Sequence, residues 1–140
     1  MYACRSHSVN TDYLGNSTAN AQLNCINYSV SSAGALTSNG GCASGQLSVV
    51  KTTDEDLNAS YTFTDKMGHV VLTRQMKGSE THDTYYVYDD KSNLCFVLQP
   101  MYQSSANLDL YAFQYKYDGR NRCIWKKLPG AGYMEMVYDN

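Results

Sequence analysis

The stretch VYDDKSNLCFVLQP, residues 87–100, decides the fold because the chain repeats it as KYDGRNRCIWKKLP at residues 116–129. Both copies read Tyr-Asp, a polar turn, a short apolar run and then proline. Aligned without gaps, Asp89 falls on Asp118 and the two prolines coincide. A phrase written twice in 140 residues indicates a repeated structural unit.

Two further copies of the phrase are weaker. TDKMGHVVLTRQM (64–76) places Asp65 on Asp89, and a last copy begins at Tyr138 and Asp139. The aspartates are 24, 29 and 21 residues apart (65 to 89, 89 to 118, 118 to 139). Periods of 20–30 residues are typical of repeat arrays.

Each position of the phrase has a physical role. Aspartate opens a turn by accepting hydrogen bonds from backbone N–H groups ahead of it. Gly, Ser or Asn two or three positions later tolerates a left-handed backbone. The apolar run returns as a strand, and proline ends it. The phrase therefore predicts a β-hairpin, with structural turn residues Asp65, Asp89, Asp118, Asp139, Tyr88, Tyr117 and Tyr138.

The rest of the chain from residue 46 reads in the same way. Runs of 7–9 residues rich in Tyr, Val, Phe or Ile alternate with polar or glycine-containing turns, among them DEDLN (54–58). This pattern predicts an all-β fold, an antiparallel meander of successive hairpins. Leu108 to Tyr115 also has helical spacing, so we expect one short helix near 104–110 before a strand from about 111.

The length fits one domain with two compositional regions. Residues 1–45 are rich in Ser, Asn and Gly and predict loops with short strands, such as 21–30. Residues 46–140 are the predicted sheet region.

Together, YVYDDKSNLCFVLQP, YKYDGRNRCIWKKLPG and MVYDN resemble the YD repeats of the Rhs family over about residues 50–140. The family unit is roughly Y-x-Y-D-x-x-G-R-L, a short strand, then P-x-G. The chain departs from it at Thr64, where the family has Tyr, and at Ser92 and Asn121, where it prefers Gly. Residues 101–110 are an insertion, and residues 46–58 are a candidate worn copy.

The resemblance implies architecture rather than chemistry. YD repeats build long sheets that coil into hollow shells within large secreted or cell-surface proteins. We therefore expect a structural module of such a protein, without catalysis or a cofactor. Its partners would be other YD-repeat segments of the parent chain, or a second copy that pairs through open sheet edges. No signal peptide is visible in the segment.

The sequence spacing of the aspartates and cysteines bears on metal binding and on disulfides. The four repeat aspartates could be calcium ligands, but they lie more than 20 residues apart, which favours turn formation. The five cysteines include no CxxC pair and no zinc-like spacing. A disulfide among Cys4, Cys25 and Cys42 is an open alternative.

Aromatic residues suggest the main alternative function. Tyr86, Tyr115 and Trp125 are a candidate ligand face for stacking against sugars, which would make the chain a carbohydrate-binding module. The basic residues near Trp125 could suggest nucleic acid, but acidic neighbours and a net charge of −2 argue against it.

An enzyme is the third hypothesis, and the sequence supports it least. His7, His69 and His82 are scattered, and no phosphate loop, HExxH or GxSxG motif appears. No apolar run approaches the 18 or so residues needed to span a bilayer.

Overall fold

The computed structural model describes residues 10–32, 34–78, 80–130 and 133–135. The chain forms two compact units, Met1–Cys25 with Gly41–Asp83, and Ile26–Gly40 with Thr84–Asn140. The described strands pair in antiparallel registers, which confirms the all-β prediction. The units interleave along the chain, so they do not follow the compositional boundary at residues 45 and 46.

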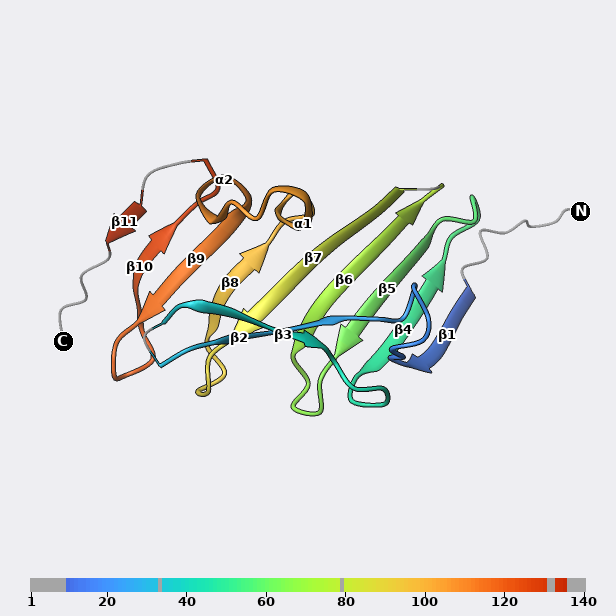
Figure 1. The fold of residues 1–140 in the computed structure, drawn as a ribbon, viewed down its shortest axis with the longest axis horizontal. Coiled ribbons are helices and arrows are strands. Elements are labelled where there is room, and N and C mark those ends of the chain that lie inside the picture. The colour runs from blue at the N-terminus through green and yellow to red at the C-terminus, as the bar shows by residue number, and fades with distance from the viewer. Residues whose placement is uncertain (1–9, 33, 79, 131–132, 136–140) are drawn as a thin grey trace, which may run out of the picture. The chain divides into compact units, whose positions relative to one another are not determined.

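The first unit contains four strands side by side in the order β1, β4, β5, β6 (Figure 1). The last three follow one another as hairpins, while β1 comes from the N-terminal region and pairs with β4. Their bounds are β1 (Asn10–Gly15), β4 (Ser48–Thr53), β5 (Ala59–Thr64) and β6 (Val70–Lys77).

The core of the first unit lies on one face of these strands. Val49 pairs with Phe63, which pairs with Leu72, and all three side chains are buried. Tyr61, two residues before Phe63 in β5, is buried on the same face, since successive side chains of a strand point to opposite sides. Burying each of these side chains stabilises the fold by about 1.5–3 kcal/mol.

Residues of the N-terminal region cover this face. The buried Asn16 side chain donates to the Ala43 carbonyl (2.9 Å) and accepts from the Leu47 N–H (2.8 Å). The Tyr61 hydroxyl donates to the side-chain oxygen of Gln22 at 3.3 Å. The region predicted as loops and short strands is therefore part of the packed structure.

The second unit holds the two clear copies of the repeat. Its sheet order is β7-β8-β9-β10-β11, and β7 runs through the boundary between the units. A separate two-stranded hairpin is formed by β2 and β3. The bounds are β2 (Ile26–Val30), β3 (Leu36–Gly41), β7 (Glu80–Tyr88), β8 (Leu94–Leu98), β9 (Ala112–Tyr117), β10 (Cys123–Lys127) and β11 (Tyr133–Glu135).

The expected short helix is present as two single turns, α1 (Tyr102–Ser105) and α2 (Leu108–Tyr111). Both lie in the predicted insertion between β8 and β9. Ala106 and Asn107 separate them, and the Asn107 side chain caps α2 by accepting from the Leu110 N–H at 3.2 Å.

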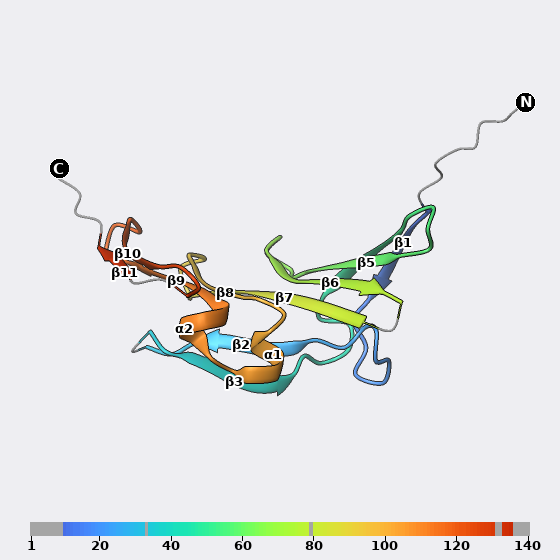
Figure 2. The same cartoon turned by 90° about the horizontal axis from the view of Figure 1, so that it is seen from above.

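The β2–β3 hairpin and the two helical turns lie on the same side of the second unit's sheet (Figure 2). The rings of Tyr28 and Tyr85 meet edge to face at 5.0 Å, and the Ile26 N–H donates to the Tyr85 hydroxyl at 3.2 Å. Beneath them, Val87 and Leu98 form the buried centre of the unit.

Candidate functional site

In three hairpins the turn begins at an aspartate of the repeat, and the three turns have the same pattern of hydrogen bonds. In each, Oδ1 of the aspartate accepts from the backbone N–H groups two and four residues ahead, at 2.8–3.0 Å. The aspartate N–H donates to the carbonyl four residues ahead, which closes a three-residue loop. These aspartates are Asp65, Asp89 and Asp118.

The third residue of each loop has a left-handed backbone. Its φ is 87° at Gly68, 66° at Ser92 and 61° at Asn121. Ser92 and Asn121, which align with Gly68 in the weaker copy, therefore adopt the conformation that glycine adopts without strain. The turns keep one geometry even where the residue type differs.

The second carboxylate oxygen of each aspartate contacts the side chain four residues ahead. The contacts are His69 Nδ1 at 3.5 Å, Asn93 Nδ2 at 3.4 Å and Arg122 Nε at 2.9 Å. The Arg122 backbone N–H, with further bonds from Arg120 and the Arg122 side chain, lowers the pKa of Asp118. The carboxylates are therefore occupied by their own turns. Within the described ranges, no group of three or more His, Cys, Asp or Glu side chains is placed to hold a metal ion.

A fourth turn of this kind lies between β4 and β5. Oδ1 of Asp54 accepts from the Asp56 and Asn58 N–H groups, both at 2.9 Å. Its left-handed residue is Leu57, with φ 65° and a side chain that is 83% exposed. The turns at Asp65, Asp89 and Asp118 follow one another at intervals of two strands. Asp54 and Asp65 are separated by the single strand β5, so the Asp54 turn does not continue this interval.

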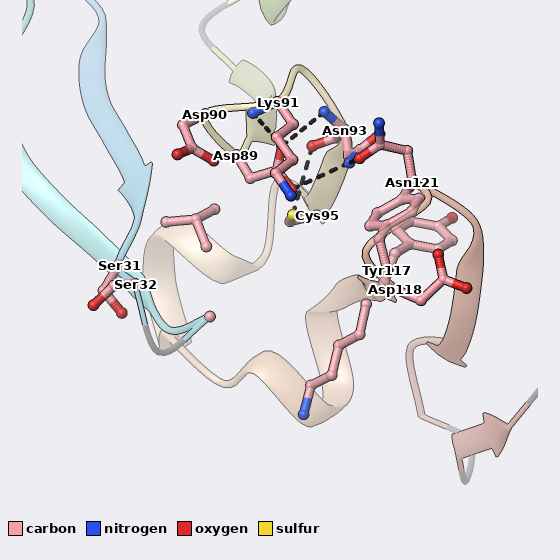
Figure 3. Close-up of a pocket in the computed structure, with 14 residues that line it drawn as sticks. Ser31, Ser32, Asp89, Asp90, Lys91, Asn93, Cys95, Tyr117, Asp118 and Asn121 are labelled. Carbon is pink, nitrogen blue, oxygen red and sulfur yellow. Dashed lines mark hydrogen bonds between the residues drawn. The ribbon is translucent and has the colours of Figure 1, made fainter.

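A polar pocket of about 590 Å³ adjoins the two clear repeat turns (Figure 3). It is lined by both turns and by the tip of the β2–β3 hairpin, including Ser31, Ser32, Asp90, Lys91, Asn93 and Asn121. The amide of Asn93 donates to the side-chain oxygen of Asn121 at 3.0 Å, which links one turn to the next. Its amide, hydroxyl and carboxylate groups make this recess a candidate ligand site.

Two titratable groups that line this pocket, Tyr117 and Cys95, have raised pKa values. The Tyr117 hydroxyl donates to the Leu94 carbonyl at 2.6 Å, and burial is the main cause that raises its pKa to about 12. Burial, followed by the charge of Asp89, raises the pKa of the Cys95 thiol to about 11. Near pH 7 neither group is a ready nucleophile, because each keeps its proton.

The three candidate ligand-face residues do not share a face. Tyr86 pairs with Val97 in a register that places it on the same side as Tyr115. Trp125 lies on the other side, where the ammonium of Lys116 sits 4.6 Å from its ring centroid. The alternation of Tyr115 and Lys116 along β9 therefore separates Trp125 from the tyrosines.

Trp125 instead lines a second pocket of about 320 Å³ in the same unit. Its other lining residues include Leu36, Phe96, Tyr102 and Leu108, and Tyr115 and Lys116 line both pockets. Aromatic and aliphatic side chains dominate this recess, so it is chemically distinct from the polar pocket beside it.

The histidines and basic residues have local partners. His82 contacts the Glu80 carboxylate at 3.1 Å on the surface, and neither it nor His69 lines either pocket. Lys127 donates to the Asp109 carbonyl at 3.1 Å. His7, Tyr138 and Asp139 lie outside the described residues.

Arg74 is the main polar residue that the sequence analysis did not single out. It is 4% exposed, and it donates to both carboxylate oxygens of Asp83 and to the carbonyls of Gln22 and Asn24 at 2.8–3.1 Å. Its guanidinium also lies over the Phe63 ring. The available signal was parity, since Arg74 is two residues beyond Leu72 on the buried side of β6.

Comparisons with protein-family models, with curated proteins and with solved structures found no match. Among the described residues, no helix has both the length and the apolar character needed to cross a membrane.

Proposed function

We propose that the chain is a structural β-repeat module of the YD-repeat type, one stretch of a larger secreted or cell-surface shell protein, with no chemistry of its own. The observation that carries this proposal is the common set of hydrogen bonds around Asp65, Asp89 and Asp118. Side chains that fold their own backbone are building elements, because their acceptor atoms are occupied within the turn.

Contacts between successive copies support an array. Tyr117, the tyrosine before Asp118, donates to the Leu94 carbonyl in the hairpin of the previous copy. Asn93 and Asn121 join the two turns directly. Each copy therefore stabilises its neighbour, as in repeat proteins, whose stability is approximately the sum of the stabilities of the single repeats and of the interfaces between them.

Duplication of one period tests the array. A second copy of residues 89–117, 29 residues long, would be inserted between Tyr117 and Asp118, which adds two strands and keeps the antiparallel order. We expect one cooperative unfolding transition in urea, with a midpoint no lower than that of the parent chain.

The matched control inserts a Gly/Ser linker of the same length at the same place. That variant pays loop-closure entropy without new contacts, so its midpoint should fall. A duplicated period that lowers the midpoint as much as the linker does would show that the sheet is not extendable.

The proposed partner is another YD-repeat segment of the parent chain or a second copy, which would pair at a sheet edge. All six residues of β1 are exposed, and an edge strand presents unpaired backbone groups. Sedimentation over a range of concentrations should show association that Tyr13→Lys weakens, since lysine on an edge discourages pairing. Tyr13 is 82% exposed, so the substitution removes no core contact.

The second candidate function is carbohydrate binding. The observation that favours it is the pair of adjoining pockets, one with carboxylate and amide groups and one with Trp125 and Tyr102. Lys116 covers one side of the Trp125 ring, which leaves less of it for stacking. A glycan array with Trp125→Ala as the control tests this function, and binding that the substitution abolishes would favour it over a purely structural role.

Surface exposure in the producing cells is tested separately. An antibody against the chain should label intact cells or the culture medium if the parent protein is secreted or displayed. Labelling only after the cells are permeabilised would contradict that part of the proposal.

A further inference from the structure

Two cysteines face each other across the base of the β2–β3 hairpin. Cys25 directly precedes β2, Cys42 directly follows β3, and the Cys42 N–H donates to the Cys25 carbonyl at 2.8 Å. Both residues belong to the first unit. They close the hairpin as an opposed antiparallel pair.

The spacing of such a pair suits a disulfide. Directly opposed residues of an antiparallel ladder have Cα atoms about 4.5–5.5 Å apart. That value lies within the roughly 4.4–6.8 Å that disulfides span. The two thiols are also hydrogen-bond partners, so their sulfur atoms already point toward each other.

The two thiols differ in access and acidity. Cys25 is 4% exposed, and the Cys42 hydrogen bond, together with burial, raises the pKa of its thiol. The charge of Arg74 opposes this rise and that of Asp83 adds to it. Cys42 is half-buried, and the hydrogen bond from Cys25 lowers its pKa to about 7. Cys42 is therefore the thiol suited to attack an oxidant, and Cys25 the one suited to resolve the intermediate.

We propose that Cys25 and Cys42 form a reversible disulfide that staples the base of the β2–β3 hairpin, with a low-molecular-weight disulfide such as oxidised glutathione as the oxidant. The Cys42 thiolate attacks one glutathione sulfur, which forms a mixed disulfide and releases one glutathione thiolate. The Cys25 thiol then loses its proton and attacks the Cys42 sulfur, which releases the second glutathione. Two protein thiols are oxidised and one glutathione disulfide is reduced.

The position of the staple gives it a structural consequence. The chain leaves the first unit after Cys25 and returns to it at Gly41. A bond between Cys25 and Cys42 closes the segment between them, and it restricts the unfolded chain more than the folded one. This inference does not depend on the repeat proposal.

Two other cysteines provide an internal control. Cys95 lies in β8 and Cys123 in β10, with β9 between them. Strands two apart are separated by roughly 9–10 Å, which is too far for a disulfide without backbone movement. They should remain thiols under conditions that oxidise the proposed pair.

Tryptic mapping after incubation of the full chain in glutathione buffers tests the proposal. No Lys or Arg lies between Arg5 and Lys51, so residues 6–51 form one peptide that contains both Cys25 and Cys42 but not Cys4. After oxidation and alkylation without reductant, we expect this peptide to carry no alkyl group and to lack two hydrogen atoms in mass. Reduction before alkylation should add two alkyl groups.

Three other outcomes would overturn the proposal. They are two alkyl groups on peptide 6–51 after oxidation, a cross-link from it to the peptide of residues 1–5 through Cys4, and a cross-link to Cys95 or Cys123. Cys42→Ser should abolish the oxidised form, whereas Cys95→Ser should leave it intact. The wild-type mapping decides the question even if Cys42→Ser does not fold.

Discussion

Replacement of one aspartate and of its direct neighbour provides the most discriminating test of the turn geometry. Asp89 and Asp90 are adjacent and have the same chemistry, but only Asp89 accepts backbone hydrogen bonds in its turn. Asp89→Ala removes these bonds, whereas Asp90→Ala removes a carboxylate of the pocket lining. The comparison separates the turn-forming role from the general effect of losing a negative charge.

The expected loss of unfolding free energy in Asp89→Ala follows from two hydrogen bonds. Oδ1 of Asp89 accepts from the N–H groups of Lys91 and Asn93, each at 2.9 Å. A side-chain bond that caps backbone N–H groups in this way contributes about 1 kcal/mol. Water can replace part of this at an exposed turn, so we expect Asp89→Ala to lower the free energy of unfolding by about 1–2 kcal/mol. Asp90→Ala should remain within about 0.5 kcal/mol of the parent.

Urea denaturation at pH 7, followed by circular dichroism, measures both values. The slope of the unfolding free energy against urea concentration should be the same in the three proteins, since unfolding exposes the same surface area in each. Equal losses for the two variants would refute the assigned role of Asp89, and with it the structural basis of the repeat.

Four further predictions concern other positions. Leu57→Gly should stabilise the chain by about 0.5–1 kcal/mol in the same assay, because it relieves a left-handed leucine whose side chain is exposed. Leu14→Gly, in a strand with no such strain, should instead destabilise it. Arg74→Ala should cost about 3–5 kcal/mol, since it leaves a carboxylate and two carbonyls without their buried partner. The pKa of Asp118 is lowered in the folded state, so its carboxylate stabilises the fold above the unfolded-state pKa, and this stabilisation is lost as pH falls through the folded-state pKa. The fall in unfolding free energy at acid pH should therefore be less steep in Asp118→Asn than in the parent chain. Tyr117→Phe should cost about 1 kcal/mol in thermal or urea unfolding, because the Leu94 carbonyl loses its donor.

The repeat hairpins could be predicted from sequence because their determinants are local. Asp89, the left-handed Ser92 and the apolar run from Leu94 all lie within ten residues. The turn needs no distant partner, since the carboxylate bonds to the backbone just ahead of it. The short helix near 104–110 was predictable for the same reason, since helical spacing is a local pattern, although the structure has two helical turns rather than one.

The role of the N-terminal region could not be read in this way. Its Ser, Asn and Gly composition indicates loops, yet the carbonyls of Gln22 and Asn24 bind a guanidinium about 50 residues away in the chain. A short-range pattern does not record that Arg74 and Asp83 meet on neighbouring strands under this segment. The Cys25–Cys42 opposition is also a tertiary fact, because 17 positions separate the two cysteines and only the β2–β3 pairing aligns them.

The candidate ligand face failed for a different reason. Side chains alternate between the two faces along each strand, which the sequence shows. Which residues of neighbouring strands share a face depends on the pairing register. A shift in the β9–β10 pairing lies between Cys123 and Trp125, and it places Trp125 opposite Lys116. One bulge residue moves a side chain to the other face of a sheet, so faces that span several strands cannot be assigned from period-two patterns alone.

The structure also explains why tyrosine and aspartate stand next to each other in the phrase. Asp118 organises the turn that follows it, through bonds to the two N–H groups ahead. Tyr117 reaches in the opposite direction, and its hydroxyl holds the Leu94 carbonyl where the preceding hairpin begins its return strand. One residue of the pair therefore shapes its own unit and the other fastens the unit before it. An array extended by this rule needs both residues in every copy. In the weaker copy at residues 64–76, Asp65 forms the turn, but Thr64 lacks the aromatic hydroxyl that would reach back.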